Sequence, residues 1–383
     1  MDQFRHLSAG ARLYYGAGAL KALPSELDRV ASARVAVLVG SSVAASADLM
    51  DLVATSVGNR PLSVLTSVRA QSPVDSVFAA AKGLRESKAD ALIAVGGGSA
   101  IVTARAANIL ASEDRCIDDL CSRLQPDGQF SSPKLSAPKL PQFVIPTTPT
   151  TAMYKAGSAV VEGKDRRRHT MFDPKTRARA IFIHPEFSLS APTELVETAS
   201  FNALAMAVEG LVSDQANPIS DAYLMQSLRL LSQRLPTSGQ RGVDSRGRGE
   251  LMLAALLCGQ GTDDASPGLA AALGHTLGER FNVANGAVNA VLLPHTMRFN
   301  LIQTADRLPK IAEALGASGT CAISAVETLL RASAAPSRLR DLGVPQSGLK
   351  QIPELAANDW FFHKNPRRVE SAGEIAQLLQ FAW

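Results

Sequence analysis

The stretch Ala91-Leu-Ile-Ala-Val95-Gly96-Gly97-Gly98-Ser99, which continues through an apolar segment to Leu110, decides how the first half of the chain folds. It joins an unbroken apolar run of strand length to three glycines and then to apolar residues at helical spacing. Ser99 stands where a serine caps a helix, because its hydroxyl can accept a hydrogen bond from a backbone N–H of the first turn. The pattern therefore predicts a strand, a tight turn and a helix.

The glycine turn also points to a ligand. Glycines allow the backbone to approach a bound molecule closely, and the first turn of a helix presents unpaired N–H groups and the positive end of its dipole. Gly96, Gly97, Gly98 and Ser99 are therefore candidates to bind a phosphate or pyrophosphate. The alternative is an ordinary strand-to-helix turn without a ligand, because a glycine triplet alone does not define a nucleotide-binding motif.

Composition limits the class of protein. The chain has 383 residues, which suits two domains of roughly 150 to 200 residues each. Its 46% hydrophobic residues contain no run long enough to span a membrane and no signal peptide, so we expect a cytoplasmic protein without a membrane partner. A net charge of +4, with no basic stripe interleaved with aromatic residues, argues against a nucleic-acid partner. Four cysteines without CxxC spacing predict free thiols.

Short apolar runs alternate with helical patterns in the first half of the chain, which is the signature of βαβ units. The predicted strands are residues 12–15, 34–39, 61–67, 91–95, 142–145 and 178–184. After residue 191 the pattern changes to helices, predicted over residues 194–213, 220–235, 248–262, 267–281, 285–300 and 306–315. We therefore predict an α/β domain with a mostly parallel sheet over residues 1–185 and an all-α domain over residues 186–383.

Polar and basic segments interrupt this pattern. The strand at residues 142–145 runs into Pro146-Thr-Thr-Pro-Thr-Thr151, and open α/β sheets bind their ligands at the carboxyl ends of strands. These threonines are candidates to contact a nucleotide, although threonine-rich turns are often purely structural. Residues 124–141 are rich in Ser, Pro, Gly and Lys and predict an exposed loop. The basic run at residues 164–169 predicts either solvated surface or an anion site.

The whole chain resembles the iron-containing alcohol dehydrogenase superfamily. The resemblance rests on the order and spacing of several motifs: Gly96-Gly-Gly-Ser99, Ile145-Pro-Thr-Thr148, Ala199-Ser-Phe-Asn202-Ala-Leu-Ala-Met206-Ala-Val-Glu209, Gly274-His-Thr-Leu-Gly278 and Asn285-Gly-Ala-Val-Asn289. The family pairs a dinucleotide-binding α/β domain with an all-helical domain, and the resemblance implies the same for residues 1–185 and 186–383.

The resemblance assigns cofactor-binding roles. It implies that Gly96, Gly97, Gly98 and Ser99 hold the pyrophosphate of NAD or NADP, and that Thr147, Thr148 and Thr151 contact its nicotinamide side. The family's lysine near the ribose falls on His169, and an aspartate of the glycine-turn helix falls on Val102. The aspartate that usually reads the adenosine ribose falls on Ser41, and without an acid to repel a 2′-phosphate both NAD and NADP stay open.

The largest departure from the family concerns its metal. The aspartate and three histidines that hold a divalent ion in family members fall on Asn202, Met206, Ala271 and Asn285, none of which is a good ligand for such a cation. Before residue 301 the helical half contains just two histidines, His275 and His295, with no HxxxH spacing. We therefore expect no bound metal. The chain is most similar to the branch of maleylacetate reductases, which are metal-independent, although that branch keeps the three histidines.

Without a metal, another group must stabilise charge and supply a proton during carbonyl reduction. His275 matches the family's histidine beside the nicotinamide and is the candidate, against the alternative of a histidine that only fills space. Arg367 and Arg368, and also Arg166, Arg167 and Arg168, are candidates to bind a substrate carboxylate, because guanidinium groups bind carboxylates bidentately.

Three functions remain open at this point. The first is a metal-independent NAD(P)H-dependent reductase of a small carbonyl compound, such as a keto acid. The second is a catalytically degenerate member that binds nucleotide and serves as a binding or assembly partner. A carbon–oxygen lyase or synthase is the third, but such enzymes of related fold depend on a metal. The family and the exposed first strand, whose edge would otherwise stay unpaired, favour a homodimer.

Overall fold

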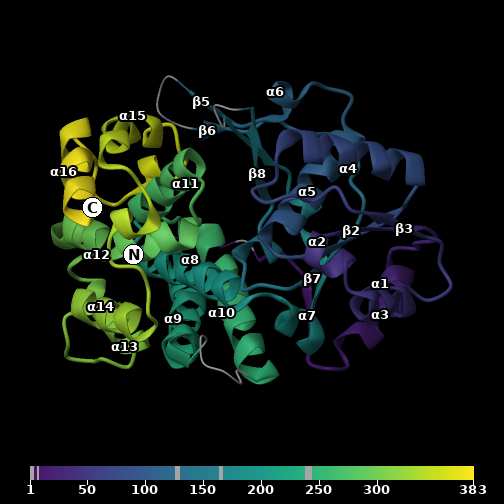
Figure 1. The fold of residues 1–383 in the computed structure, drawn as a ribbon, viewed down its shortest axis with the longest axis horizontal. Helices are drawn as coiled ribbons and strands as arrows, with labels where there is room; N and C mark the ends of the chain where they lie inside the picture. The colour runs from purple at the N-terminus through teal and green to yellow at the C-terminus, as the bar shows by residue number, and fades with distance from the viewer. Residues whose placement is uncertain (1–3, 7, 126–129, 164–166, 238–243) are drawn as a thin grey trace. The chain divides into compact units, whose positions relative to one another are not determined.

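The computed structural model describes residues 4–6, 8–125, 130–163, 167–237 and 244–383. The chain divides into two compact units (Figure 1). One unit is Ala9–Pro192, and the other is Thr193–Trp383 together with the described residues at the N-terminus, 4–6 and 8. The first unit ends just after helix α7 (Pro185–Ser190), whereas the sequence placed the boundary near residue 185.

A parallel sheet forms the centre of the first unit. Its six strands are β1 (Arg12–Tyr15), β2 (Val35–Val39), β3 (Leu62–Leu65), β4 (Ala91–Gly96), β7 (Gln142–Pro146) and β10 (Ala178–Ile183). They lie in the order β1-β10-β7-β4-β2-β3, and every neighbouring pair is parallel. Each strand corresponds to one predicted from the sequence, so the predicted α/β class with a mostly parallel sheet is confirmed.

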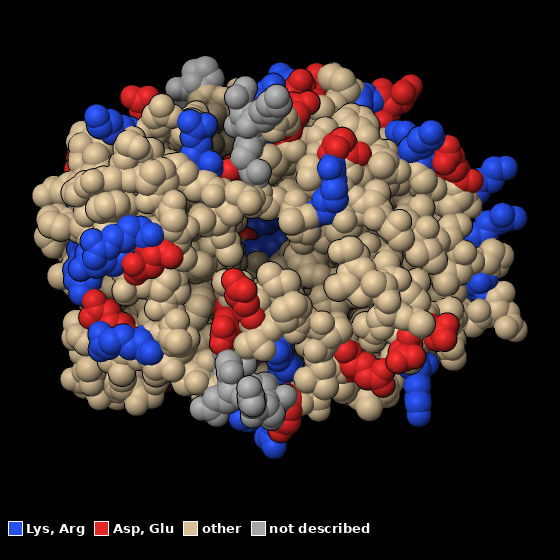
Figure 2. All heavy atoms as spheres, in the orientation of Figure 1, with Lys and Arg blue, Asp and Glu red and all other residues tan. Residues whose placement is uncertain are grey.

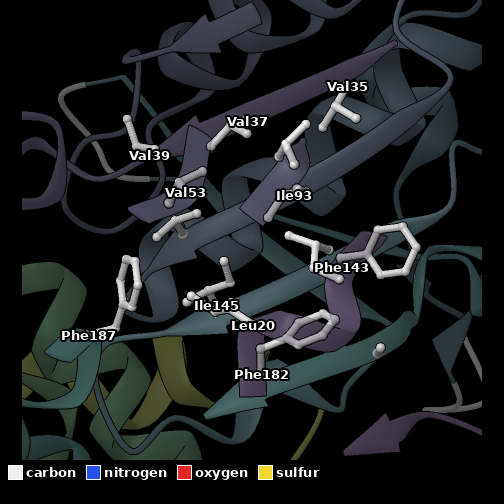
Figure 3. Packing of buried hydrophobic residues seen from close by; sticks show 14 of the residues in the cluster. Leu20, Val35, Val37, Val39, Val53, Ile93, Phe143, Ile145, Phe182 and Phe187 are labelled. Carbon is white, nitrogen blue, oxygen red and sulfur yellow. The ribbon is translucent and has the colours of Figure 1, made fainter. Parts of the chain in front are cut away.

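Helices cover both faces of this sheet. Helices α1 (Leu23–Arg29) and α3 (Ala47–Val57) lie on one face, and α4 (Val74–Ser87) and α5 (Gly98–Ser112) lie on the other (Figure 1). Figure 3 shows the packing on the first of these faces, with alternate residues of the strands against Val53 of α3. Strands covered on both sides must be apolar throughout, which explains the continuous apolar runs in the sequence.

Two short antiparallel pairs lie outside the main sheet. One is formed by β8 (Gly157–Glu162) and β9 (Arg167–Phe172), with residues 164–166 of the predicted basic run outside the described part of the chain. The other is formed by β5 (Arg123–Leu124) and β6 (Phe130–Ser131). The sequence predicted an exposed loop over residues 124–141. It missed this strand pair, because strands of two residues leave no periodicity to detect.

The second unit is helical. Its longer helices are α8 (Thr193–Leu211), α9 (Pro218–Arg234), α10 (Ser245–Asp264), α11 (Leu269–Phe281), α12 (Asn285–Thr304), α13 (Leu308–Ala314), α14 (Ala322–Ala332) and α16 (Ala372–Ala382). The described residues from Thr193 onward contain no strand, so the all-α prediction is confirmed. Leu273 and Leu277 of α11 pack with Val288 and Leu292 of α12 in its core.

Two observations describe the helices and the surface charge. Among the described residues, no helix combines the length and the apolar character needed to cross a membrane. On the face drawn in Figure 2, basic and acidic side chains lie interspersed among uncharged residues.

Candidate functional site

The glycine turn links β4 to α5. Gly96 ends the strand with a φ of 144°, a backbone conformation that side chains disfavour, and a Cβ there would lie 2.8 Å from the Cβ of Ala100. Gly97 is the N-cap residue and α5 begins at Gly98, so the prediction that Ser99 caps the helix was wrong. No side chain caps this helix, and the Ala100 N–H donates to the Gly97 carbonyl at 3.1 Å.

The threonine turn lies directly against the glycine turn. Pairing of β4 with β7 places Gly96 opposite Pro146, and the Thr147 N–H donates to the Gly96 carbonyl at 3.0 Å. A Cβ on Gly97 would lie 3.0 Å from Thr148 Oγ1, and one on Gly98 would lie 3.1 Å from Thr150 Oγ1. The absence of side chains on these glycines therefore lets the two turns touch.

The predicted threonines differ in their exposure. Thr147, Thr148 and Thr151 are buried, and Thr151 begins a short 3-10 helix. Thr150 is partly exposed, and its hydroxyl accepts a hydrogen bond from the Ala152 N–H. Thr150 was among the four threonines predicted as nucleotide contacts, although the family resemblance gave roles only to Thr147, Thr148 and Thr151.

Ser41 joins the same edge of the sheet. The Gly40 N–H donates to the Val95 carbonyl at 3.1 Å, which places the end of β2 beside the glycine turn. The connection from β2 runs outward to β3, whereas the connection from β4 runs the opposite way to β7. Ligands of open α/β sheets bind at such a switch point, outside the carboxyl ends of the strands. Ser41 and the glycine turn both lie there.

Ser99 has an internal role. Its hydroxyl accepts a hydrogen bond from the Gln71 N–H at 3.1 Å, and its carbonyl accepts one from the Ser72 hydroxyl at 3.1 Å. Both loop residues have positive φ values, 62° and 51°, and these bonds hold the loop between β3 and α4 against the start of α5.

His169 lies on β9, outside the main sheet. Its side chain is only 2% exposed, with Nε2 at 2.7 Å from Glu162 Oε2 and Nδ1 at 3.6 Å from Cys121 Sγ. Burial is the main cause that raises the pKa of the Cys121 thiol to about 11, so the thiol stays protonated at neutral pH. Both ring nitrogens of His169 thus have partners within the hairpin region, and its contact with a cofactor stays a prediction.

In the helical unit, His275 on α11 pairs with a carboxylate. Its Nδ1 lies 2.9 Å from Asp359 Oδ2, and the two side chains are 16% and 8% exposed. The Phe361 N–H donates to Asp359 Oδ1 at 2.9 Å, and the Phe361 ring centroid lies 5.6 Å from that of His275. The carboxylate therefore fixes the ring orientation with Nδ1 as the donor, which leaves Nε2 for other chemistry.

The sequence analysis missed Asp359. It lies 84 residues after His275, in a segment that shows no helical or strand periodicity. No local pattern connects the two residues, and only the packing of the last part of the chain against α11 brings them together.

Glu209 anchors the start of α11. Its fully buried carboxylate accepts N–H bonds from Gly268 at 3.0 Å, Ala270 at 2.5 Å and Ala271 at 3.1 Å. Burial raises the pKa of this carboxyl to about 7, because desolvation outweighs the stabilisation from the three N–H groups. An acidic residue at the positive end of α11 thus satisfies backbone donors that have no partner within the helix.

The four positions that hold the metal in the family do not form a metal site here. Ala271 offers no donor, and the Asn202 Nδ2 donates to Met206 Sδ at 3.3 Å. Asn285 packs against α11, where a Cβ on Gly278 would overlap its Oδ1. Within the described part of the chain, no group of three or more His, Cys, Asp or Glu side chains has a geometry that could hold a metal ion. These residues therefore do not fit a divalent ion.

An amide network occupies this region of the helical unit. Asn289 is completely buried, its Nδ2 lies 2.9 Å from Asn202 Oδ1, and its side chain lies so close to Gly274 that a Cβ there would overlap it. Gly274 precedes His275 on α11. Asn202 on α8, Asn289 on α12 and the helix that carries His275 are thus held in one packed unit.

The candidate arginines have different surroundings. Arg367 donates to the Phe299 carbonyl at 3.0 Å, forms an ion pair with Glu374 at 2.5 Å and lies over the Phe299 ring. Its guanidinium thereby connects α12 to α16. Arg368 is exposed, and Arg167 pairs with Asp118 at 3.1 Å on the surface. Arg166 lies outside the described residues, and a substrate role for any of these side chains stays a prediction.

The chain combines a parallel sheet that has a glycine turn at its switch point with a helical unit that holds a partly buried histidine–carboxylate pair, which places it in the class of proteins that join an α/β unit to an all-α unit. Comparison with known families narrows this class. Residues 10–185 match the family described as "Iron-containing alcohol dehydrogenase", and residues 196–383 match "Fe-containing alcohol dehydrogenase family, C-terminal". The chain belongs to the iron-containing alcohol dehydrogenase family and is an oxidoreductase.

Individual relatives agree with this assignment. The chain is 30% identical over 375 residues to a maleylacetate reductase from Sphingobium indicum, covering 97% of this chain and 95% of that one. It is 28% identical over 379 residues to an NAD-dependent methanol dehydrogenase from Bacillus methanolicus, covering 96% and 97%. The crystal structure of a maleylacetate reductase from Agrobacterium tumefaciens is similar, with a TM-score of 0.82, 26% identity and coverage of 100% and 99%. The predicted family is thus confirmed.

The close contact at Gly274 predicts intolerance of a side chain. Gly274→Ala should lower the free energy of unfolding by about 1–3 kcal/mol, because the new methyl group must displace the Asn289 amide. Chemical denaturation followed by circular dichroism measures this change. Gly373→Ala in α16 is the control, because its Cβ would meet only Ser371 Oγ at 3.5 Å. Equal stabilities of the two variants would contradict the prediction.

Glu209 should make stability depend on pH. Its folded-state pKa of about 7 lies above the ordinary value of 4.5, so the folded protein holds this proton more tightly than the unfolded chain does. The stability from this group is complete below pH 4.5 and is lost as the pH rises to about 7. The loss should be about 3 kcal/mol.

Denaturation curves between pH 4.5 and 8 test this dependence. Relative to wild type, Glu209→Gln should show a flatter pH profile of unfolding free energy in that window, because the amide does not titrate. Parallel profiles for the two proteins would show that Glu209 does not titrate there.

Proposed function

We propose that this chain is an NAD(P)H-dependent reductase of small carbonyl compounds that works without a bound metal. The pairing of His275 with Asp359 carries the proposal, because it supplies an oriented proton donor in the half of the family fold that usually holds the metal. The glycine turn supports the cofactor, and the relatives include reductases and dehydrogenases whose names specify NAD or maleylacetate.

We assign the cofactor to the carboxyl edge of the sheet. When bound, a reduced nicotinamide supplies the hydride for the carbonyl carbon. The N–H groups at the start of α5 bind its pyrophosphate, and Thr147, Thr148 and Thr151 contact the nicotinamide side. Ser41 carries no charge to repel a 2′-phosphate, so the site accepts either NAD or NADP.

His275 acts as the proton donor in this proposal. Its Nδ1–H is held by Asp359, and in the imidazolium form Nε2–H is the proton that the carbonyl oxygen takes up, which leaves the neutral imidazole. Asp359 positions the ring and stabilises its protonated form. The Phe361 ring beside the imidazole limits access of water from that side.

A keto acid such as maleylacetate is the substrate class that the relatives favour. Of the two predicted C-terminal arginines, Arg367 already binds Glu374 and the Phe299 carbonyl, whereas Arg368 is exposed. We therefore assign carboxylate recognition to Arg368 and helix anchoring to Arg367.

We also propose a homodimer. Strand β1 stands at the end of the main sheet, and Leu13 and Tyr15 on it are 41% and 45% exposed. An exposed edge strand with apolar side chains is covered in most native proteins, and a second copy of the same strand is the simplest cover.

A nucleotide-binding protein without catalysis is the second candidate function. The observation that favours it is the loss of charged ligands at Asn202, Met206, Ala271 and Asn285. Thermal-shift titration with NADH and NADPH, followed by turnover assays with aldehydes and keto acids, separates the two. Binding without consumption of the cofactor across the panel would favour the second candidate.

Removing the imidazole should abolish turnover. We expect His275→Ala to lower kcat by about 10²–10⁴-fold, the usual contribution of a positioned acid, while NADH affinity stays within about twofold. Steady-state kinetics and NADH fluorescence titration measure the two effects. Unchanged kcat would contradict the role of His275.

Asp359→Asn tests the other member of the His275–Asp359 pair with a smaller change. The amide keeps the size of the side chain but does not stabilise an imidazolium, so kcat should fall while KM changes little. Steady-state kinetics separates the effects on kcat and KM. A kcat equal to that of wild type in the folded variant would contradict the positioning role of Asp359.

Metal content tests the second part of the proposal. The purified protein should contain less than about 0.1 iron or zinc atom per chain, because no charged ligand set is available for a divalent ion. Elemental analysis measures this content, and EDTA should leave turnover unchanged. Stoichiometric zinc or iron that supports activity would overturn metal independence.

A further inference from the structure

We infer that Asn202 takes over part of the metal's work by donating a hydrogen bond to the substrate carbonyl oxygen. The inference rests on the proposed reductase function and extends it by naming the group that stabilises negative charge on oxygen. Its starting observation is the position of Asn202 on α8. From Ser200 to Ser213 every residue is buried except Asn202, so the one residue of this segment that reaches the surface carries an amide.

The Asn202 amide can donate one more hydrogen bond than it makes within the protein. As placed, its Oδ1 accepts from Asn289 Nδ2 at 2.9 Å, and its Nδ2 donates to the Met206 thioether at 3.3 Å, a weak acceptor. An amide nitrogen carries two N–H bonds. Among the described residues, no nitrogen or oxygen atom accepts from this Nδ2.

If the oxygen and nitrogen atoms of the Asn202 and Asn289 amides are exchanged, Asn202 still has one N–H without a nitrogen or oxygen acceptor. With Asn289 reversed, its Nδ2 donates to the Ala270 carbonyl at 2.9 Å and to the Asn285 carbonyl at 3.2 Å, and its Oδ1 faces Asn202. Asn202 then donates one N–H to Asn289 and retains the second. Both arrangements therefore hold Asn202 rigidly while one N–H stays available for a ligand.

Asn289 is the positioning residue for this donor. It is completely buried and lies against Gly274, which directly precedes His275. The donor on α8 and the imidazole on α11 thus share one rigid frame, which preorganisation of a reacting site requires. Flexible attachment of either group would lose this benefit.

The charge of the amide suits the reaction. The carbonyl carbon accepts a hydride from the reduced nicotinamide, and the π electrons of the C=O bond move onto oxygen. That oxygen accepts a hydrogen bond from Asn202, which keeps its proton, and then takes a proton from His275 Nε2. The carbonyl is reduced and the nicotinamide oxidised. A neutral donor stabilises the developing alkoxide, whereas an aspartate without a metal would repel it.

The test compares Asn202→Asp and Asn202→Ala with wild type. Loss of one preorganised donor should lower kcat by about 10²–10³-fold, with NADH affinity within about twofold and metal content unchanged. Asn202→Ser, which keeps a hydroxyl donor, should retain more activity than Asn202→Ala. Asn59→Asp, at an exposed turn residue of the other unit, is the matched control and should keep wild-type kcat.

The outcomes separate the inference from the function on which it rests. Absence of turnover in wild type with every carbonyl compound tested would overturn the proposed function. Wild-type turnover together with full activity of the folded Asn202→Ala variant, as judged by circular dichroism, would overturn only the role of Asn202.

Discussion

Parallel pairing of β4 with β7 is the interaction on which the contact between the glycine turn and the threonine turn depends. It sets Gly96 opposite Pro146 and thereby brings two turns into contact that lie about 50 residues apart in the chain. The close contact also needs glycines, because a Cβ on Gly97 or Gly98 would press against a threonine hydroxyl. Backbone register and side-chain size thus cooperate, and a change in either would separate the N–H groups of α5 from the threonines.

In the helical unit, too, glycines allow close contact between neighbouring elements, here between α11 and α12. Small residues of α11 allow Asn285 and Asn289 of α12 to lie against its backbone, and Glu209 satisfies the N–H groups at its start. Buried amides and a buried carboxyl are costly unless they are hydrogen-bonded, so these contacts also select one arrangement of the helices. The packing of α11 against α12 and Glu209 therefore helps to position His275, in addition to the contacts of its own side chain.

The sequence predicted those features that depend on local pattern. Short apolar runs identified the strands of the sheet, and the signal is most continuous for β2 and β4, whose residues are all buried. The N-cap was misassigned to Ser99 because the glycine at the true N-cap, Gly97, leaves no side-chain signal. Ser99, two residues later, binds the neighbouring loop instead. Asp359 was missed because its partner His275 is distant in sequence, and such a pair is visible only after the chain is packed.

The residues at the four positions that hold the metal in the family are all uncharged. A single retained histidine or aspartate in this region would be a polar or charged group without its ion, and burial would make it costly. Asn202, Met206, Ala271 and Asn285 are all neutral, and Asn202 is hydrogen-bonded to its neighbours. Their combined effect is to make the region stable without a cation. Stability alone would be satisfied equally by apolar side chains at all four positions. Asn202 is the one residue of Ser200–Ser213 that is not buried, and it lies next to the amide that packs against Gly274. An amide at this position therefore calls for a further reason, and stabilisation of charge on a substrate oxygen supplies one.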